Sequence, residues 1–433
     1  MIEALLPESA RALEGVLEWV DSRFGPLYDF CLRRLPPPEP AWWCSTCQLA
    51  RAPAGAHFTE VPAGASGCST SPAEAQARML GEALERYSGF HAADRLQTAS
   101  LPPSDALGEL KFPLCHADEP CSPSLRGMGL DHPIPHVHLH HLADERPAWI
   151  PAAYVDLSYR ARLGESAVTY PISTGLAFHS DLHQAVWGGL CEVAERDATM
   201  IMWWCRKQPV RIRCDTRGTP AQIQDRLHRL RRVGMTAGLF EISTDFPAPV
   251  VVCVLRAEQY PYLTLGSCCH SDPVVACVKS LDEAVMVRQR GGSPVAVVPS
   301  VERFDWVQSW DDHVRLYADR RMLQHLGFLL DTRRTQTYEE FAGRGWEPAP
   351  PSLDGVRGIA RRLQSAGLTV IWAEVTAPEV RPFGHVIRVV VPQMVPLSAT
   401  HQVRWLGTAR LWQAACLRSA ALSDFNPYPH PFA

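Results

Sequence analysis

Two segments of the chain carry the same acidic pattern, Glu-x-x-Glu-Arg, among mostly apolar residues. The pattern occurs at Glu82, Glu85 and Arg86 in "GEALERYSGF", and again at Glu192, Glu195 and Arg196 in "CEVAERDATM". Carboxylates three residues apart share a helix face and repel each other mildly. Because the neighbouring residues are apolar, we expect both pairs to be largely buried, and buried carboxylates need a cation or become protonated.

Magnesium would meet this need, because it prefers hard oxygen ligands and often bridges carboxylates to nucleotide phosphates. The arginines beside the carboxylates could pair with phosphate oxygens in bidentate fashion. If the two helices face each other, four carboxylates converge. The residues alone therefore favour a nucleotide and magnesium site, and they leave open structural ion pairs or a metallohydrolase.

A third segment matches the two acidic ones when all three are aligned on their expected helix caps. The caps are Ser71, Asp181 and Asp272, and a glutamate lies eleven residues beyond each, at Glu82, Glu192 and Glu283. Eleven residues make about three helical turns, so each glutamate shares a face with its cap. Alanine four residues and leucine nine residues beyond each cap also match. We interpret the three helices as equivalent units packed on sheets.

The residues before each helix predict a strand and then a turn of small residues. We expect strands at 56–61, 167–172 and 260–266, followed by "PAGASGCST", "STGLAFHS" and "SCCHS". A helix N-terminus after such a turn suits a phosphate. Neither the P-loop pattern nor the Rossmann glycine pattern occurs in the chain.

The other segments alternate strand and helix over 209–256 and 355–395, which predicts an α/β fold. We also expect a helix over 306–326 and a loop-dominated region over 101–150. The C-terminus "NPYPHPFA" alternates prolines at Pro427, Pro429 and Pro431, so it must be an extended tail.

The composition excludes some classes of protein. The 433 residues are 46% hydrophobic and 20% charged, with a net charge of −4, which does not favour nucleic-acid binding. The first residues are acidic and amphipathic, so we expect no signal peptide, and we find no apolar run long enough to span a membrane. We expect a cytoplasmic protein whose 14 cysteines are reduced.

Two further Cys and His patterns are weak metal signals. Cys44 and Cys47 form a C-x-x-C without a second such pair, so we expect packed or loop cysteines, with zinc shared with another segment as the alternative. The run His136–His141 alternates like a strand, but no carboxylate or thiolate pattern accompanies it.

These motifs resemble the YcaO family. Its signature contains Ser-x-x-x-Glu-x-x-Glu-Arg, a second Glu-x-x-Glu-Arg followed by Asp, and Glu-x-x-Gln-x-Arg. Here the last motif is Glu283, Met286 and Arg288, and Asp197 follows the second. Arg78 stands in the serine position, Met286 in the glutamine position, and Cys68 in the place of a lysine before Ser71. The tail and the segments "VIRVVVPQMVPL" and "WLGTARL" resemble the azoline-forming cyclodehydratase branch.

The resemblance implies a non-P-loop ATP fold and a set of site residues. Magnesium would be held by Glu82, Glu85, Glu192 and Glu195, and the nucleotide by Ser71, Arg86, Arg196, Glu283 and Arg288. The tail, with Pro427, Pro429, Pro431 and the carboxylate of Ala433, would reach the reaction centre. There a Cys, Ser or Thr of a precursor peptide adds to the preceding carbonyl, and ATP phosphorylates the resulting oxyanion, which leaves a thiazoline or oxazoline.

The resemblance also implies partners and domains. We expect an N-terminal extension over 1–55, a catalytic domain over 56–422 and the tail over 423–433. The extension is too short for the E1-like (ocin-ThiF-type) domain that grips leader peptides, so we expect a separate leader-binding partner, and a homodimer is compatible with the family. The alternatives are thioamide formation by the same fold and a non-catalytic nucleotide-binding scaffold.

Overall fold

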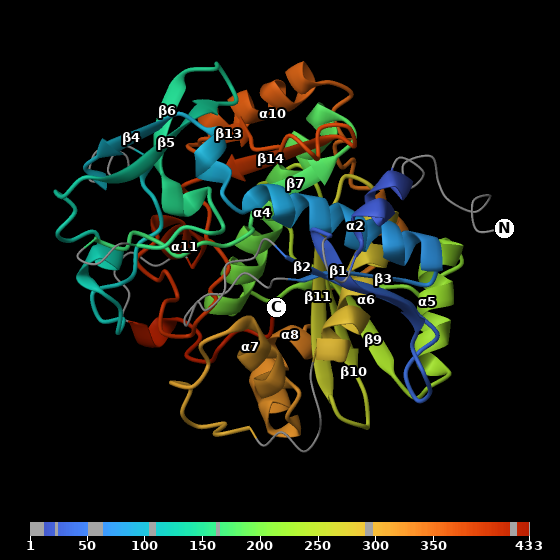
Figure 1. The fold of residues 1–433 in the computed structure, drawn as a ribbon. Helices are drawn as coiled ribbons and strands as arrows, with labels where there is room; N and C mark the ends of the chain where they lie inside the picture. Colours follow the sequence, from blue (N-terminus) through green and yellow to red (C-terminus); the bar gives the residue numbers. More distant parts are fainter. Residues whose placement is uncertain are drawn as a thin grey trace.

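The chain folds into three β-sheets with helices packed against them (Figure 1). The structure is a computed structural model, and it describes residues 13–21, 25–50, 64–103, 110–161, 165–290, 298–415 and 422–432. The mixed α/β organisation confirms the predicted fold class. None of the described helices is long and apolar enough to cross a lipid bilayer.

The sheets contain three, five and six strands. The first has the order β1 (Leu27–Arg34), β2 (Trp43–Leu49) and β3 (Gly64–Ser69). The second has the order β11 (Leu263–Cys269), β10 (Val250–Arg256), β9 (Thr236–Glu241), β8 (Val210–Arg213) and β12 (Thr335–Thr337). The third has the order β4 (Thr98–Leu101), β5 (Ile134–His141), β13 (Ile371–Glu374), β14 (His385–Val390) and β7 (Leu176–His179), and β6 (Pro147–Pro151) pairs with β5. Neighbouring strands are antiparallel except β8 and β12.

Three long helices each follow one strand of a different sheet. They are α2 (Pro72–Gly89) after β3, α4 (Leu182–Trp204) after β7 and α6 (Pro273–Arg290) after β11. In Figure 1, α2 crosses the middle of the view, with β9–β11 below it and β5, β13 and β14 above it. The predicted caps are confirmed, because the side chains of Ser71, Asp181 and Asp272 each accept a hydrogen bond from a backbone N–H of the first turn.

The remaining helical segments are shorter. The α-helices are α5 (Ala221–Arg231), α7 (Trp310–Tyr317), α8 (Gly327–Leu330), α9 (Tyr338–Ala342), α10 (Leu353–Ser365) and α11 (Ala409–Ala414). The 3-10 segments are η2 (Glu14–Trp19), η3 (Ala92–Arg95), η4 (Pro123–Arg126), η5 (Ala152–Tyr154), η6 (Arg320–Leu326) and η7 (Leu422–Asp424).

The strands before α2, α4 and α6 lie later in the sequence than predicted. Residues 167–172 are not a strand, and β7 instead begins at Leu176, inside the predicted turn. Similarly, β3 occupies the small-residue segment that predicted a turn, and β11 continues through Cys269. The predicted strand over 56–61 lies outside the described residues.

Close packing between strand and helix explains a glycine in β3 and another in β11. A Cβ on Gly67 would lie 2.1 Å from the backbone oxygen of Ala75 in α2, and a Cβ on Gly266 would lie 2.4 Å from the backbone nitrogen of Ala284 in α6. A small residue is therefore a packing requirement at these positions, although the same composition is typical of turns.

Other predicted elements are confirmed with two corrections. The strands and helices expected over 209–256 and 355–395 are β8, α5, β9, β10, α10, β13 and β14. The single helix expected over 306–326 is broken, because Asp319 caps a new segment, η6, through its side chain. The region 101–150 contains β5 and β6, although it was predicted to be mainly loop.

Candidate active site

The three equivalent glutamates are anchored in the same way. Glu82 accepts a hydrogen bond from the backbone N–H of Ser66 (2.6 Å), and Glu283 accepts one from Ser267 (2.5 Å). Glu192 accepts one from Gly175 (3.1 Å). Each donor lies in or just before the strand that precedes the helix of its glutamate. The repeat inferred from the sequence is therefore a repeat of side-chain geometry.

Glu195 joins two of these units. Its carboxylate accepts hydrogen bonds from the hydroxyl of Ser267 (2.6 Å) and from the backbone N–H of Cys269 (2.9 Å). Since Glu195 lies on α4 and both donors lie on β11, this carboxylate fixes the second unit to the third.

The glutamates line a cavity with two adjoining lobes, which share Ser66, Gly67, Arg196, Glu283 and Met286. The first, which we call the strand lobe, has a volume of about 540 Å³ and is lined by Glu192 and Glu195, among others. The second, which we call the tail lobe, has a volume of about 480 Å³ and is lined by Glu82 and Arg86, among others. Six predicted site residues thus come together at one cavity: Glu82, Arg86, Glu192, Glu195, Arg196 and Glu283.

The two arginines of the repeated motif stay close to their own glutamates. Arg86 pairs with Glu82 at 2.5 Å and also donates to the carbonyl of Gly64, while Arg196 lies 3.8 Å from Glu192. Burial lowers the pKa of Arg196, but Glu195 and Glu192 raise it more, so the net shift is upward. Arg196 therefore stays charged at the border of the two lobes.

Burial and mutual repulsion keep protons on several of the carboxyl groups. Burial raises the pKa of Glu192 to about 7, although Arg196 opposes the shift. Burial and the nearby Glu195 raise the pKa of Glu283 to about 8. Burial also raises the pKa of Glu85 well above its usual range, helped by Glu192 and Glu82. Glu192 and Glu283 line the cavity, whereas the predicted metal ligand Glu85 is not among the lining residues of either lobe. Carboxyl groups with raised pKa values at a cavity are typical of a site that receives positive charge.

The donor set suits Mg²⁺ shared with phosphates. Within the described ranges, no three His, Cys, Asp or Glu side chains are close enough to enclose a metal ion by themselves. Mg²⁺ usually keeps water ligands and binds through one or two carboxylates together with phosphate oxygens, so it does not require such a cage. Glu82, Glu192, Glu195 and Glu283 line the cavity as oxygen donors of this kind.

Ser71 and Arg288 do not reach the cavity. Ser71 caps α2, and its hydroxyl faces the backbone N–H of Glu74. Arg288 pairs with Glu39 at 2.8 Å and donates to the carbonyls of Tyr260 and Pro261. The predicted nucleotide contacts of these two side chains have no support in this geometry, because their groups serve helix capping and packing.

The three departures from the family signature are neighbours in space. Arg78, in the serine position, donates to the carbonyl of Cys68 (2.6 Å) and to Asp282 (2.8 Å). Cys68, Arg78 and Met286 all line the strand lobe. A fixed guanidinium therefore lies beside the position where the family has a lysine, which keeps a positive charge at this wall of the cavity.

Asp282 is the buried centre of this wall. Its carboxylate accepts hydrogen bonds from the indole of Trp42 (2.8 Å) and from Arg226 (2.8 and 3.1 Å), as well as from Arg78. Asp282 was not predicted as a site residue from the sequence, although it directly precedes Glu283.

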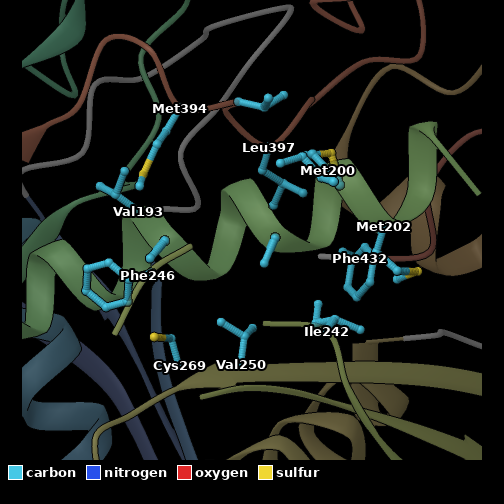
Figure 2. Close-up of a cluster of buried hydrophobic side chains, with 14 of the residues drawn as sticks. Val193, Met200, Met202, Ile242, Phe246, Val250, Cys269, Met394, Leu397 and Phe432 are labelled. Carbon is cyan, nitrogen blue, oxygen red and sulfur yellow. The ribbon is translucent and has the colours of Figure 1, made fainter. Parts of the chain in front are cut away.

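The described part of the tail is packed against the protein. Pro429 and Pro431 are buried, whereas Pro427 is exposed, and Ala433 lies outside the described residues. The carbonyl of Tyr428 accepts a hydrogen bond from Trp203 (2.9 Å), and that of Pro429 accepts one from Tyr317 (2.6 Å). Phe432 lies in the same apolar cluster as Met200 and Met202 of α4 (Figure 2).

The tail also borders the tail lobe. The His430 ring stacks on His313 with centroids 3.9 Å apart, and it bonds through Nε2 to the carbonyl of Ser398 at 2.6 Å. Its ring centroid lies 6.4 Å from that of Trp310. Trp310 and Leu397, the residue before Ser398, both line the tail lobe. The tail therefore lies one side chain away from the cavity.

The C-x-x-C and the histidine run are structural in the described part of the chain. Cys44 and Cys47 are three residues apart on β2 and belong to different apolar clusters, so they cannot hold zinc as a pair. Instead, Cys44 faces Cys68. His138 and His140 lie edge to face on β5, with ring centroids 4.8 Å apart.

Arg388 on β14 is a second buried charged residue that was not predicted from the sequence. This buried guanidinium donates to the carbonyls of Tyr154 and Ile172, and its Nη1 has no hydrogen-bond partner in the structure. Burial lowers its pKa to about 10, against the effect of Glu192. Arg388 lies within "VIRVVVPQMVPL", which was noted only as a resemblance to the family.

Sequence comparison defines the class of protein to which this fold and cavity belong. Residues 66–395 match the family described as "YcaO cyclodehydratase, ATP- and Mg²⁺-binding". The match covers most of the chain, and the protein therefore belongs to the YcaO family, whose cofactors are ATP and Mg²⁺.

Two curated relatives have no described function. An "uncharacterized protein in tfuA 3'region" of Rhizobium leguminosarum bv. trifolii is 31% identical over 129 residues, which are 27% of this chain and 30% of the relative. An uncharacterized protein of Methanothermobacter thermautotrophicus is 25% identical over 228 residues, which are 52% of this chain and 56% of the relative. The matched part thus spans about a third to a half of these relatives.

Solved structures share the fold at low sequence identity. A heterocyclase in complex with substrate and cofactor superposes with a TM-score of 0.73 and 18% identity, covering 98% of this chain and 57% of that one. YcaO from Methanopyrus kandleri, bound with AMPPCP and Mg²⁺, gives a TM-score of 0.62 at 18% identity and 90% coverage of both chains. A chain of the E. coli microcin synthetase McbBCD complex gives 0.56 at 18% identity, with 84% of this chain and 88% of that chain covered.

Proposed function

We propose that this protein is an ATP- and Mg²⁺-dependent cyclodehydratase that converts Cys, Ser or Thr residues of a ribosomally made precursor peptide into thiazoline or oxazoline rings. The observation that carries the proposal is the set of three backbone-anchored glutamates at one cavity: Glu82, Glu192 and Glu283. Membership of the YcaO family and the packed tail support it.

In this proposal, residues from both lobes of the cavity hold the triphosphate and its metal ion. Glu82, Glu192, Glu195 and Glu283 provide the oxygen ligands, and Arg196 pairs with phosphate oxygens. When bound, ATP supplies the phosphoryl group that turns the amide oxygen into a leaving group, and Mg²⁺ neutralises the charge on the phosphates. The backbone N–H groups of Ser66, Gly175 and Ser267 orient the glutamates beforehand.

The peptide would enter the tail lobe, next to the C-terminal tail. Arg290, Trp310 and Gln289 line this lobe and offer polar and aromatic contacts to an extended chain. The tail is held by His313, Tyr317 and Trp203, so little conformational entropy remains to be lost at the site. A rigid wall near the amide excludes water, which would otherwise compete for the phosphoryl group.

The proposal keeps the partner and domain assignments made from the sequence. A leader-binding partner of the E1-like type would present the precursor peptide, as expected for cyclodehydratases. The microcin synthetase structure with the same fold is a complex of several proteins. In the present structure, β1 and β2 lie before residue 55. β1 pairs with β2 and β2 pairs with β3, so the predicted N-terminal extension contributes two strands to the first sheet.

The experiment that tests the proposal combines the purified protein, a candidate leader-binding partner, a leader-bearing peptide, ATP and Mg²⁺. Mass spectrometry should show the loss of one water mass for each ring formed, whereas thioamide formation would increase the mass. Glu82→Ala and Glu192→Ala should each reduce product formation by about 100-fold or more, because each removes an anchored oxygen ligand.

A matched control is Glu258→Ala, which removes a carboxylate that is 84% exposed and pairs with an exposed arginine, Arg320, at 3.7 Å. This variant should keep wild-type product formation. Unchanged product formation by both Glu82→Ala and Glu192→Ala would refute the magnesium assignment, and product formation without the partner would refute the need for it.

A further inference from the structure

One pair of cysteines at the cavity wall has no role in the proposed reaction. Cys44 of β2 and Cys68 of β3 are direct cross-strand partners in an antiparallel pair. Their Sγ atoms are 3.1 Å apart and share a hydrogen bond. Every cysteine in the described ranges is a free thiol, and these two are buried, at 6% and 3% exposure.

The backbone geometry around this pair permits a disulfide. Directly opposite residues in antiparallel strands have Cα atoms about 4.5 or 5.5 Å apart, and both separations lie within the range of disulfides. Closing the bond brings the sulfur atoms from 3.1 Å to about 2.05 Å, so they move by about 1 Å in total.

Both sulfur atoms belong to residues that small solutes can reach through the cavity. Cys44 lines the tail lobe and Cys68 lines the strand lobe. The hydrogen bond from Cys68 lowers the pKa of Cys44, with Arg33 nearby acting in the same direction and burial opposing it. A lowered pKa increases the thiolate fraction, and the thiolate is the species that reacts with oxidants.

We propose that Cys44 and Cys68 form a redox modification site, in which a peroxide oxidises the two thiols to a disulfide and thereby weakens binding of the magnesium-bound nucleotide. The Cys44 thiolate attacks one peroxide oxygen, which breaks the O–O bond and gives a sulfenic acid and hydroxide. The Cys68 thiol then attacks that sulfur and gives up its proton, and the sulfenic hydroxyl leaves as water. Overall, two thiols lose two electrons and two protons, and hydrogen peroxide becomes two waters.

The link between this disulfide and the cavity is strand β3. Ser66, two residues before Cys68, donates the backbone hydrogen bond that orients Glu82. The carbonyl of Cys68 accepts a hydrogen bond from the guanidinium of Arg78. Pulling Cys68 toward β2 therefore disturbs both anchors, and disturbing the groups that orient metal ligands typically lowers metal affinity by about 10- to 100-fold. We expect oxidised protein to bind the magnesium-bound nucleotide about 10- to 100-fold more weakly.

The test treats the whole protein with hydrogen peroxide and maps its peptides without reduction. A Cys44–Cys68 crosslink should appear and disappear with dithiothreitol. Binding of AMPPCP with Mg²⁺, measured by calorimetry, should weaken on oxidation and recover on reduction. Cys44→Ser and Cys68→Ser should abolish the crosslink and the loss of affinity, whereas Cys47→Ser, on the same strand but in another apolar cluster, should keep both.

The absence of the crosslink in oxidised wild-type protein would overturn the inference. A crosslink that leaves nucleotide affinity unchanged would overturn its consequence for binding. That consequence rests on the proposed function, but the crosslink does not. If reduced protein binds no nucleotide at all, the proposed function is refuted. The redox site is then still tested by the presence or absence of the Cys44–Cys68 crosslink in the peptide map.

Discussion

Binding of Mg²⁺ and a nucleotide should release protons from the protein, because metal ligands must be deprotonated. The perturbation is the addition of AMPPCP with Mg²⁺ at a fixed pH. In the free protein, the pKa of Glu283 is raised to about 8 and that of Glu192 to about 7, in both cases first by burial. Bound positive charge favours the carboxylates and lowers both pKa values.

The magnitude follows from these pKa values. At pH 8, Glu283 carries about half a proton and Glu192 about a tenth, so binding should release about 0.6 proton per site. At pH 9.5 both groups are already ionised and the release should be close to zero. Affinity for Mg²⁺ with the nucleotide should therefore rise with pH up to about pH 8 and then level off.

Stability without metal should depend on pH in the opposite sense. The folded pKa values of Glu192 and Glu283 lie above the ordinary value of 4.5, so the folded chain holds protons that the unfolded chain has released. The free energy of unfolding should therefore fall as pH rises from about 4.5 to about 8 through these two groups. Mg²⁺ with the nucleotide should remove much of this loss.

The assay is titration calorimetry in two buffers with different ionisation enthalpies, which gives the number of protons released. Glu283→Gln should remove most of the release at pH 8, since it removes the group that holds about half a proton there. The exposed control Glu258→Gln should behave as the wild type. Equal heats in both buffers for the wild type, or an unchanged release in Glu283→Gln, would refute the reasoning.

Two further predictions concern the wall and the tail. Asp282→Asn should lower the free energy of unfolding by about 3 kcal/mol, because it removes the close carboxylate partner (2.8 Å) of the buried Arg226, whose other carboxylate neighbour, Glu74, lies at 4.0 Å. Urea unfolding checks this against the exposed control Asp354→Asn. Phe432→Ala should weaken tail docking by about 3 kcal/mol and so reduce ring formation, with faster carboxypeptidase digestion as the independent measurement. The exposed Pro427→Ala should change neither, and a Phe432→Ala tail as resistant as wild type would contradict the packing argument.

Periodic and capped elements could be predicted from the sequence, whereas strand positions near the site could not. Asp181 and Asp272 cap their helices as expected, because capping depends on a few adjacent residues. Strand β3 was placed too early, because its glycines are read as turn residues although Gly67 packs closely against α2. The propensity of a residue for strand or turn does not indicate how closely a helix packs against it.

The sequence by itself determined the repeat: three caps, three glutamates eleven residues beyond them, and a tail that cannot be helical. Only the tertiary structure decided which side chains share a cavity. It brought Glu82, Glu192 and Glu283 together, turned Arg288 toward Glu39, and placed Cys68 against Cys44. The physical reason is that helix periodicity fixes the face of a side chain, but contacts between segments distant in sequence depend on how the sheets and helices pack.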